Sequence, residues 1–418
     1  MVMDLLTGAP SPAGVEPSNI APAWPEITPR IASRWPVYGE DEVAAVADIL
    51  RSGRVNALHH GERCKELEAR FAALCGMPHA VAVANGTLAL EVALRALGVG
   101  PGDEVIVPAR SFVASASCVV ACGAMPVFAD IDMTSQGLTA DLVAERLTHR
   151  TRAIILVHLG GYPAAADEIA SLARQQGVVL VEDCAQAHGA TLNGAAVGGF
   201  GDAAAFSFCT DKIMSTGGEG GMVLFRDGAA ARRGWSLKDH GKDRDAVGTP
   251  ARTQGFRWLH RRFGSNYRLT EMQAAIGLVQ LTKLDDWIAL RRRNAEILLD
   301  ELEGCRALRV VRPRNGIGHA YYKFYTFVRP DELHADWSRE RIVEEAWNTG
   351  IPCQTGICPE IYREEAFTRT GIGPGQPLPV ARLLGETSIM LPVDPTMSEA
   401  SCQAMGRVLR SIANEASC

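Results

Sequence analysis

The chain has 418 residues, of which 47% are hydrophobic and 22% charged, and its formal net charge is −6. This length suffices for two domains, or for one large domain with a smaller partner. The acidic balance gives no basic face, so we expect no nucleic-acid partner. The longest apolar stretch, residues 112–129, is interrupted by serine, glycine and proline, so we expect no membrane span.

The eleven cysteines are spaced irregularly and form neither a CxxC metal pair nor a disulfide ladder. Buried, reduced thiols in a cytoplasmic enzyme account for them, and we expect no metal site. Residues 1–30 contain several prolines and lack the basic start of a signal peptide. We interpret them as an N-terminal arm.

Helical and strand patterns alternate through the first half of the chain. This rhythm predicts an α/β fold, in which a mainly parallel mixed sheet lies between helices. The predicted elements are helices over 41–50 and 62–75, a strand over 79–87, a helix over 88–97, a strand, a helix and a strand within 102–132, a strand over 151–161, a helix over 164–176, and strands over 178–181, 203–208 and 221–225.

The second half of the chain is less regular. Residues 226–262 have weak periodicity, and we expect an irregular excursion there. Thr270 can cap a long helix that links two domains, and 320–328 is the clearest strand beyond it. We therefore predict a large domain over 31–285 and a smaller C-terminal α+β domain over 286–418.

Two strand ends carry candidate chemistry. The apolar run 178–181 is followed by Glu182 and Asp183, and the run 203–208 is followed by Lys212 and a glycine-rich turn. Ligands bind at the carboxyl ends of strands in open α/β sheets. The chain has six lysines and 36 arginines, and lysine, unlike arginine, can lose its proton and act as a nucleophile.

A lysine that forms a Schiff base with an aldehyde, and a carboxylate that keeps a pyridine nitrogen protonated, are what proteins contribute to pyridoxal phosphate chemistry. The alternative is a solvated loop lysine, Lys212, and a helix-capping aspartate, Asp183. Gly86 and Thr87 begin a predicted helix and could bind phosphate through its free amides, or form an ordinary helix cap. Phe112 could stack on a flat cofactor or belong to the core.

From about residue 34 to its C-terminus, the chain resembles the DegT/StrS-type sugar aminotransferases, fold-type I pyridoxal phosphate enzymes of the aspartate aminotransferase superfamily. The segments that carry the resemblance are ANGTLAL (84–90), PARSFVASA (108–116), PVFADID (126–132), VEDCAQAHGA (181–190), GDAAAFSFCTDKIMSTGGEGGM (201–222) and SNYRLTEMQAAIG (265–277).

The resemblance implies that Lys212 forms the Schiff base with pyridoxal 5'-phosphate and that Asp183 pairs with the pyridine nitrogen. Asn266 is similar to an asparagine that reaches the phosphate of the neighbouring subunit, which implies a homodimer with shared active sites. The other implied cofactor contacts are Gly86, Thr87 and Ser207 for the phosphate, Phe112 for stacking, and Gln186 for the ring hydroxyl.

Residues near the predicted strand 320–328 are candidate substrate contacts, although a structural strand with one or two exposed polar groups would look the same. His188 is expected to be a hydrogen-bonded histidine that supports the site rather than a catalyst. The candidate substrate contacts are His319, Tyr321, Tyr322 and Lys323.

These features predict a ping-pong aminotransferase with pyridoxamine 5'-phosphate as an intermediate. L-glutamate or L-glutamine would give its amino group to a keto sugar, foremost a nucleotide-linked keto-deoxysugar on a route to amino sugars of surface polysaccharides or natural products. Alternatives are an aminotransferase for a keto-cyclitol, as in aminoglycoside-type pathways, and a catalytically idle regulatory protein that binds pyridoxal phosphate. A nicotinamide site is disfavoured because the turn at 85–87 is not GxGxxG.

Overall fold

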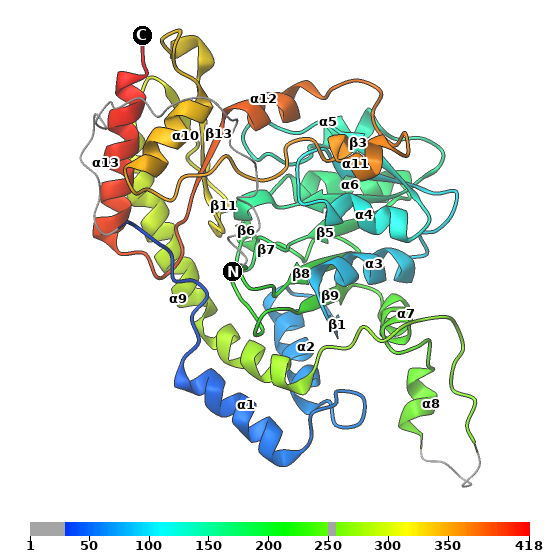
Figure 1. The fold of residues 1–418 in the computed structure, drawn as a ribbon. Coiled ribbons are helices and arrows are strands. Elements are labelled where there is room, and N and C mark those ends of the chain that lie inside the picture. The colour runs from blue at the N-terminus through cyan, green and yellow to red at the C-terminus, as the bar shows by residue number, and fades with distance from the viewer. Residues whose placement is uncertain (1–29, 250–255) are drawn as a thin grey trace.

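The computed structural model describes residues 30–249 and 256–418. At its centre lies a seven-stranded sheet in the order β1-β9-β8-β5-β4-β2-β3 (Figure 1). All neighbouring strands are parallel except β9, which is antiparallel to β1 and β8. The predicted α/β architecture with a mainly parallel mixed sheet is confirmed. The strands are β1 (His79–Val83), β2 (Glu104–Pro108), β3 (Met125–Ala129), β4 (Thr151–Val157), β5 (Val179–Asp183), β8 (Ala203–Ser207) and β9 (Gly221–Phe225).

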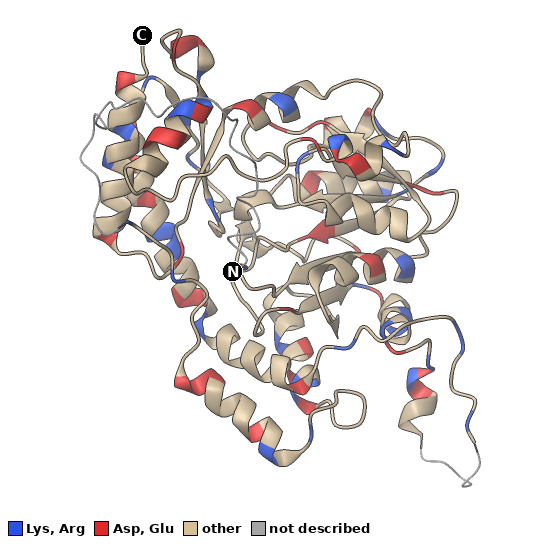
Figure 2. Ribbon diagram, in the orientation of Figure 1, with Lys and Arg blue, Asp and Glu red and all other residues tan. Residues whose placement is uncertain are grey.

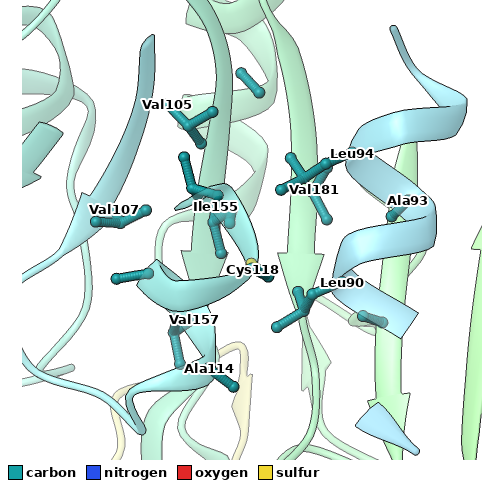
Figure 3. Packing of buried hydrophobic residues seen from close by; sticks show 14 of the residues in the cluster. Leu90, Ala93, Leu94, Val105, Val107, Ala114, Cys118, Ile155, Val157 and Val181 are labelled. Atoms are coloured by element: carbon teal, nitrogen blue, oxygen red, sulfur yellow. The ribbon is translucent and has the colours of Figure 1, made fainter. Parts of the chain in front are cut away.

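The central strands are buried on both faces. In β2, Val105 and Val107 belong to one hydrophobic cluster, while Ile106 between them belongs to another on the opposite face. Successive residues of a strand point to opposite faces, so an unbroken apolar run marks a strand covered on both sides. Figure 3 shows the first cluster, where Leu90 and Leu94 face the sheet residue Val181.

Helices cover both faces of this sheet. One face packs against α3 (Gly86–Ala96), α4 (Ala114–Ala121) and α7 (Gly228–Lys238). The other face packs against α2, α6 and the first half of α9. The remaining bounds in this half of the chain are α1 (Glu40–Ser52), α2 (Glu62–Leu74), α5 (Ala140–Ala144), α6 (Ala166–Gln176), β6 (Thr191–Leu192) and β7 (Ala195–Ala196).

The segment predicted as an irregular excursion contains two helices, α7 and α8 (Arg244–Gly248), and the prediction was wrong there. Asp227 caps α7 by accepting a hydrogen bond of 2.7 Å from the amide of Ala230, and Ala230, Ala231 and Leu237 are buried. Small alanine side chains give a weak periodic signal, although alanine has the highest helix propensity. Beyond α7, α8 stands away from the sheets (Figure 1).

The long helix α9 (Glu271–Leu302) is capped by Thr270, whose hydroxyl and the side chain of Gln273 complete a capping box. Its last turns pack against α13 (Glu399–Glu415) in a separate hydrophobic cluster. This C-terminal region has a three-stranded sheet in the order β10-β12-β13. Its elements are β10 (Leu308–Val310), β11 (Ile317–Gly318), β12 (Phe324–Val328), α10 (Arg339–Asn348), α11 (Glu365–Thr368), α12 (Pro379–Thr387) and β13 (Ser388–Leu391).

The C-terminal segment does not stay apart from the large sheet. Tyr362 and Phe367 pack edge-on against Phe128 of β3, and β11 pairs with β6. The predicted division between residues 285 and 286 falls inside α9 and stays a prediction. The predicted arm over 1–30 lies outside the described residues except for Arg30.

Acidic and basic residues are interspersed along most of the elements (Figure 2). Among the helices that the structure describes, none is long and apolar enough to cross a membrane.

Candidate active site

Asp183 ends β5 as a buried carboxylate with neutral partners. Its Oδ2 accepts a hydrogen bond of 2.8 Å from Ser115 Oγ, and its Oδ1 accepts one of 3.2 Å from the amide of Ala185. Burial raises the pKa of Asp183 above its ordinary value. Among the ion pairs of the described residues, none involves Asp183. A buried carboxylate of this kind fits a ligand that brings its own positive charge, such as a protonated ring nitrogen.

Glu182, the neighbour of Asp183, has a structural role. Its carboxylate accepts hydrogen bonds of 2.8 Å from the amides of Gly198, Phe200 and Gly201, and one of 3.1 Å from His158 Nε2. Burial raises the pKa of Glu182, but the His158 side chain and these amides outweigh burial and lower it overall. The loop before β8 is therefore tied to the end of β5.

His158 also holds the Asp183 backbone. Its amide donates to the Asp183 carbonyl over 3.1 Å, and its Nδ1 accepts from the amide of Ala164 over 3.1 Å. The Nε2 proton therefore points at Glu182. The Cys184 thiol lies within 4.8 Å of the His158 ring nitrogen and the Glu182 carboxylate oxygen that face it. Both ring nitrogens of His158 already make hydrogen bonds, so the hydrogen bonds account for this group of three residues without a metal.

Lys212 lies in the loop after β8, with its side chain 16% exposed. Its Nζ is 3.5 Å from the hydroxyl of Tyr322 and 3.7 Å from Asp211 Oδ1. Its carbonyl accepts a hydrogen bond of 2.8 Å from Trp35 Nε1. The loop then turns through Gly218, whose φ of 122° is open to glycine but costly for other residues.

The expected phosphate cradle is assembled where α3 begins. The helix starts at Gly86, two residues before its predicted start, and Asn85 caps it by accepting 2.9 Å from the amide of Leu88. A Cβ on Gly86 would lie 2.6 Å from Ser207 Cβ, closer than such atoms can approach. Gly86, Thr87 and Ser207 thus meet at a helix N-terminus, whose first amides have no acceptor within the helix.

Phe112 and Gln186 also have side-chain groups available to a flat ring. Phe112 lies in the turn before α4 and is 59% exposed, so it does not belong to the core. Gln186 Oε1 accepts a hydrogen bond of 2.7 Å from the amide of Gly160, in a short 3-10 turn (Leu159–Gly161) after β4. This bond orients the Gln186 amide and leaves its NH2 group to donate to a ligand oxygen.

The four candidate substrate contacts divide into two pairs, one beside a small cavity and one near Lys212. β12 begins at Phe324, so all four lie in the turn before the strand. His319 stacks on Tyr321 with ring centroids 3.7 Å apart, and both line a cavity of about 20 Å³, room for one water molecule. Tyr322 faces Lys212 instead, and Lys323 Nζ is 5.2 Å from the centre of the Tyr322 ring.

Sequence reasoning missed Asp211. Its carboxylate accepts a hydrogen bond from the Tyr322 hydroxyl and lies beside Lys212. The available signal was its place next to Lys212 in the sequence, but the partner is 111 residues away.

His188 is not the hydrogen-bonded histidine that the sequence predicted. Neither ring nitrogen makes a hydrogen bond of normal geometry with the described residues. The ring lies among Phe71, Phe206 and Phe208. Burial, followed by the positive charges of Lys212 and Arg291, lowers the pKa of His188 to about 3. The residue is therefore a neutral part of the core beneath the site.

Asn266 is exposed and forms a β-bridge with Asp239 at the base of the excursion that contains α8. Earlier in this excursion the side chains of Phe256, Trp258 and Phe263 are 80%, 84% and 96% exposed. Phe256 and Trp258 pack edge-on with ring centroids 4.8 Å apart.

A sequence model of the DegT/DnrJ/EryC1/StrS aminotransferase family matches residues 36–410. An aminotransferase structure from Psychrobacter cryohalolentis is similar over 90% of this chain and 97% of that chain, with 45% identity and a TM-score of 0.87. GDP-perosamine synthase from Caulobacter vibrioides is 41% identical over 89% of this chain and 95% of that protein. L-glutamine:2-deoxy-scyllo-inosose aminotransferase from Streptomyces kanamyceticus is 36% identical over 88% of this chain and 87% of that protein.

Proposed function

Because the chain belongs to the DegT/DnrJ/EryC1/StrS aminotransferase family, we propose that Lys212 and Asp183 are the catalytic pair of its active site. The protein is a pyridoxal-phosphate-dependent sugar aminotransferase. The observation that carries the proposed site is Asp183, a buried carboxylate without a cationic partner among the described residues, at the same edge of the sheet as Lys212. A protonated ring nitrogen would supply the missing charge.

The residues at this edge fit each part of the cofactor. Bound pyridoxal phosphate supplies an electron sink that stabilises negative charge developing at Cα of an amino acid. Lys212 Nζ would hold its aldehyde carbon, and Asp183 would keep its ring nitrogen protonated. The remaining contacts would be Gly86, Thr87 and Ser207 to the phosphate, Phe112 to the ring face, and Gln186 to the ring oxygen.

Lys212 then has a second task as the proton carrier. With the cofactor bound, Lys212 Nζ would accept the proton that leaves Cα of the amino donor. In the second half of the cycle Nζ would move a proton in the opposite direction while the keto sugar is aminated. Both transfers would require Nζ to be neutral and to stay close to the carbon that loses or gains the proton.

The proposed acceptor is a nucleotide-linked keto sugar, and the proposed amino donor is L-glutamate or L-glutamine. The similarity to GDP-perosamine synthase supports the acceptor. The second candidate is a keto-cyclitol, which the similarity to L-glutamine:2-deoxy-scyllo-inosose aminotransferase supports at a lower identity. A catalytically idle regulatory role is disfavoured because Lys212 and Asp183 are both present. The cytoplasmic location stays a prediction.

We also propose a homodimer in which Asn266 of one subunit reaches the phosphate in the other. The exposed position of Asn266 and the three exposed aromatic side chains of the neighbouring excursion support this arrangement. Mixing Lys212→Ala subunits with Asn266→Ala subunits tests it, because one of the two sites in a mixed dimer would then be intact. Restored activity is expected, and mixed dimers that stay inactive would contradict the shared site.

The role of Lys212 is tested by absorption spectra of the purified protein with pyridoxal phosphate. We expect the wild type to show the visible band of a lysine-bound cofactor and Lys212→Ala to lose both this band and turnover. A Lys212→Ala variant that kept the band and the activity would refute the assignment.

A further inference from the structure

We propose that Asp211 and Tyr322 form a holding site for the Lys212 amine. The site keeps Nζ in position while Lys212 is detached from the cofactor and carries the proton. This inference rests on the proposed role of Lys212. It makes Asp211 and Tyr322 positioning residues for both halves of the reaction and assigns Tyr322 a role other than sugar recognition.

The two residues meet Lys212 from separate parts of the chain. Tyr322 donates its hydroxyl hydrogen to Asp211 Oδ2, so its oxygen lone pairs remain for the amine, 3.5 Å away. The other Asp211 oxygen, Oδ1, is 3.7 Å from the same Nζ. The centre of the Tyr322 ring is 4.8 Å from Nζ, within range of a cation–π contact. A small movement of the Lys212 side chain would bring Nζ within ordinary hydrogen-bond distance of the Tyr322 hydroxyl oxygen and Asp211 Oδ1.

Tyr322 is held firmly enough to act as a fixed point. Arg291 of α9 donates hydrogen bonds of 3.3 Å from one nitrogen, Nη1, to the carbonyls of Tyr321 and Tyr322. Gly161 lies so close that a Cβ there would be 3.0 Å from both of their amide nitrogens. Tyr321 adopts a φ of 48°, which non-glycine residues rarely do. Such backbone conformations persist where the surrounding structure imposes them.

Lys212 is fixed at its backbone in the same way. Its carbonyl accepts the hydrogen bond from Trp35, and Trp35 packs edge-on against Trp287 of α9 with ring centroids 4.8 Å apart. The same helix therefore anchors both sides of the contact, Tyr322 through Arg291 and Lys212 through Trp35.

Charge favours the same arrangement. Burial, followed by Asp211, raises the pKa of Tyr322 well above its ordinary value, so the phenol keeps its proton and donates it to Asp211. Partial desolvation raises the pKa of Asp211, whose side chain is still 57% exposed, but Lys212 and the Tyr322 hydroxyl outweigh it and hold the pKa below its ordinary value. Asp211 is thus an ionised carboxylate beside Lys212. The titratable groups around Lys212 are Asp211 and Cys209 of its own loop, Tyr322 and Lys323 before β12, Asp183 at the end of β5, and His188 after β5.

A holding site and a sugar contact predict different kinetics. A residue that recognises the sugar affects only the half-reaction in which the keto sugar is aminated, and mainly its binding. A residue that holds Lys212 affects proton transfer in both half-reactions and leaves binding of the donor and the sugar largely unchanged.

The test uses the holoenzyme and the variants Asp211→Asn and Tyr322→Phe, with Tyr362→Phe as the matched control. Tyr362 is a second buried tyrosine that donates to a carboxylate, Glu360, but it packs against Phe128. Single-turnover rates are measured for each half-reaction over a range of donor and keto-sugar concentrations, which separates an effect on rate from an effect on binding.

We expect both test variants to slow both half-reactions by about tenfold or more, as one lost positioning contact does. Tyr362→Phe should match the wild type in both half-reactions. Asp211→Glu should recover part of the rate, which distinguishes loss of the carboxylate from a folding defect.

Unchanged rates in both half-reactions would overturn the proposal, as would an effect confined to binding of the keto sugar. If Asp211→Asn does not fold, the two half-reactions of Tyr322→Phe decide the question. A Lys212→Ala variant that retained the lysine-type band would instead refute the proposed function, so the two failures are distinguishable.

Discussion

Replacing Gly86 by alanine tests the phosphate cradle with the smallest possible change. The new Cβ would lie 2.6 Å from Ser207 Cβ and 3.0 Å from Ser207 Oγ. The φ of Gly86 is not in the left-handed region, so alanine is permitted by the backbone and the effect is steric. The start of α3 and the end of β8 must move apart, and overpacking of this kind costs about 1–3 kcal/mol.

If this cost destabilises only the cofactor-bound state, it weakens cofactor binding by the same free energy. Because about 1.4 kcal/mol corresponds to a tenfold change in Kd, the Kd for pyridoxal phosphate should rise about five- to 150-fold. The assay is titration of the apoprotein with pyridoxal phosphate and with pyridoxal, which lacks the phosphate. The loss should be large for the first ligand and small for the second. Gly100→Ala is the control, because a Cβ there meets nothing within 4 Å. A Gly86→Ala protein with wild-type affinity for both ligands would refute the reasoning.

Three further outcomes follow from the site. Glu182→Gln leaves one acceptor oxygen for the three amides and His158 that the carboxylate serves, so it should cost about 3 kcal/mol and lower Tm by about 3 °C. An unchanged Tm would contradict the structural role of Glu182. His188 stays neutral in the folded protein, since its pKa is lowered to about 3 from an unfolded value of 6.5. As the pH falls below 6.5, the unfolded chain therefore gains a proton that the folded protein does not. The free energy of unfolding should drop by about 2 kcal/mol by pH 5. His188→Asn should therefore lose less Tm than the wild type between pH 8 and pH 5, and equal losses would contradict this account. Asp183→Asn should weaken binding of pyridoxal phosphate and stop turnover, whereas near-normal activity would exclude Asp183 as the partner of the ring nitrogen.

The sequence was most informative where one strand end determines the position of a side chain. Asp183 directly follows the buried run of β5, and Gly86 follows β1 at the start of a helix. In a parallel sheet these ends meet at one edge, so their proximity can be predicted without knowing the contacts. The same reasoning placed Lys212 after β8.

The sequence was least informative where a contact joins distant segments. The Asp211–Tyr322 hydrogen bond spans 111 residues, and it depends on the turn before β12, which the apolar pattern of 320–328 hid as part of the strand. The alanine-rich helix α7 was missed because small side chains weaken the periodic signal. The return of Tyr362 and Phe367 to the core of the large sheet likewise left no local trace in the pattern.

The most direct test of the central claim is a single-turnover absorbance measurement. The holoenzyme is converted to its pyridoxamine form with L-glutamate or L-glutamine, the donor is removed, and nucleotide-linked keto sugars and free keto-cyclitols are added in turn. We predict that the visible band of the cofactor bound to Lys212 returns with a nucleotide-linked keto sugar. A band that returns only with a keto-cyclitol would contradict the proposed acceptor, and a protein that never forms the band would contradict the catalytic role of Lys212.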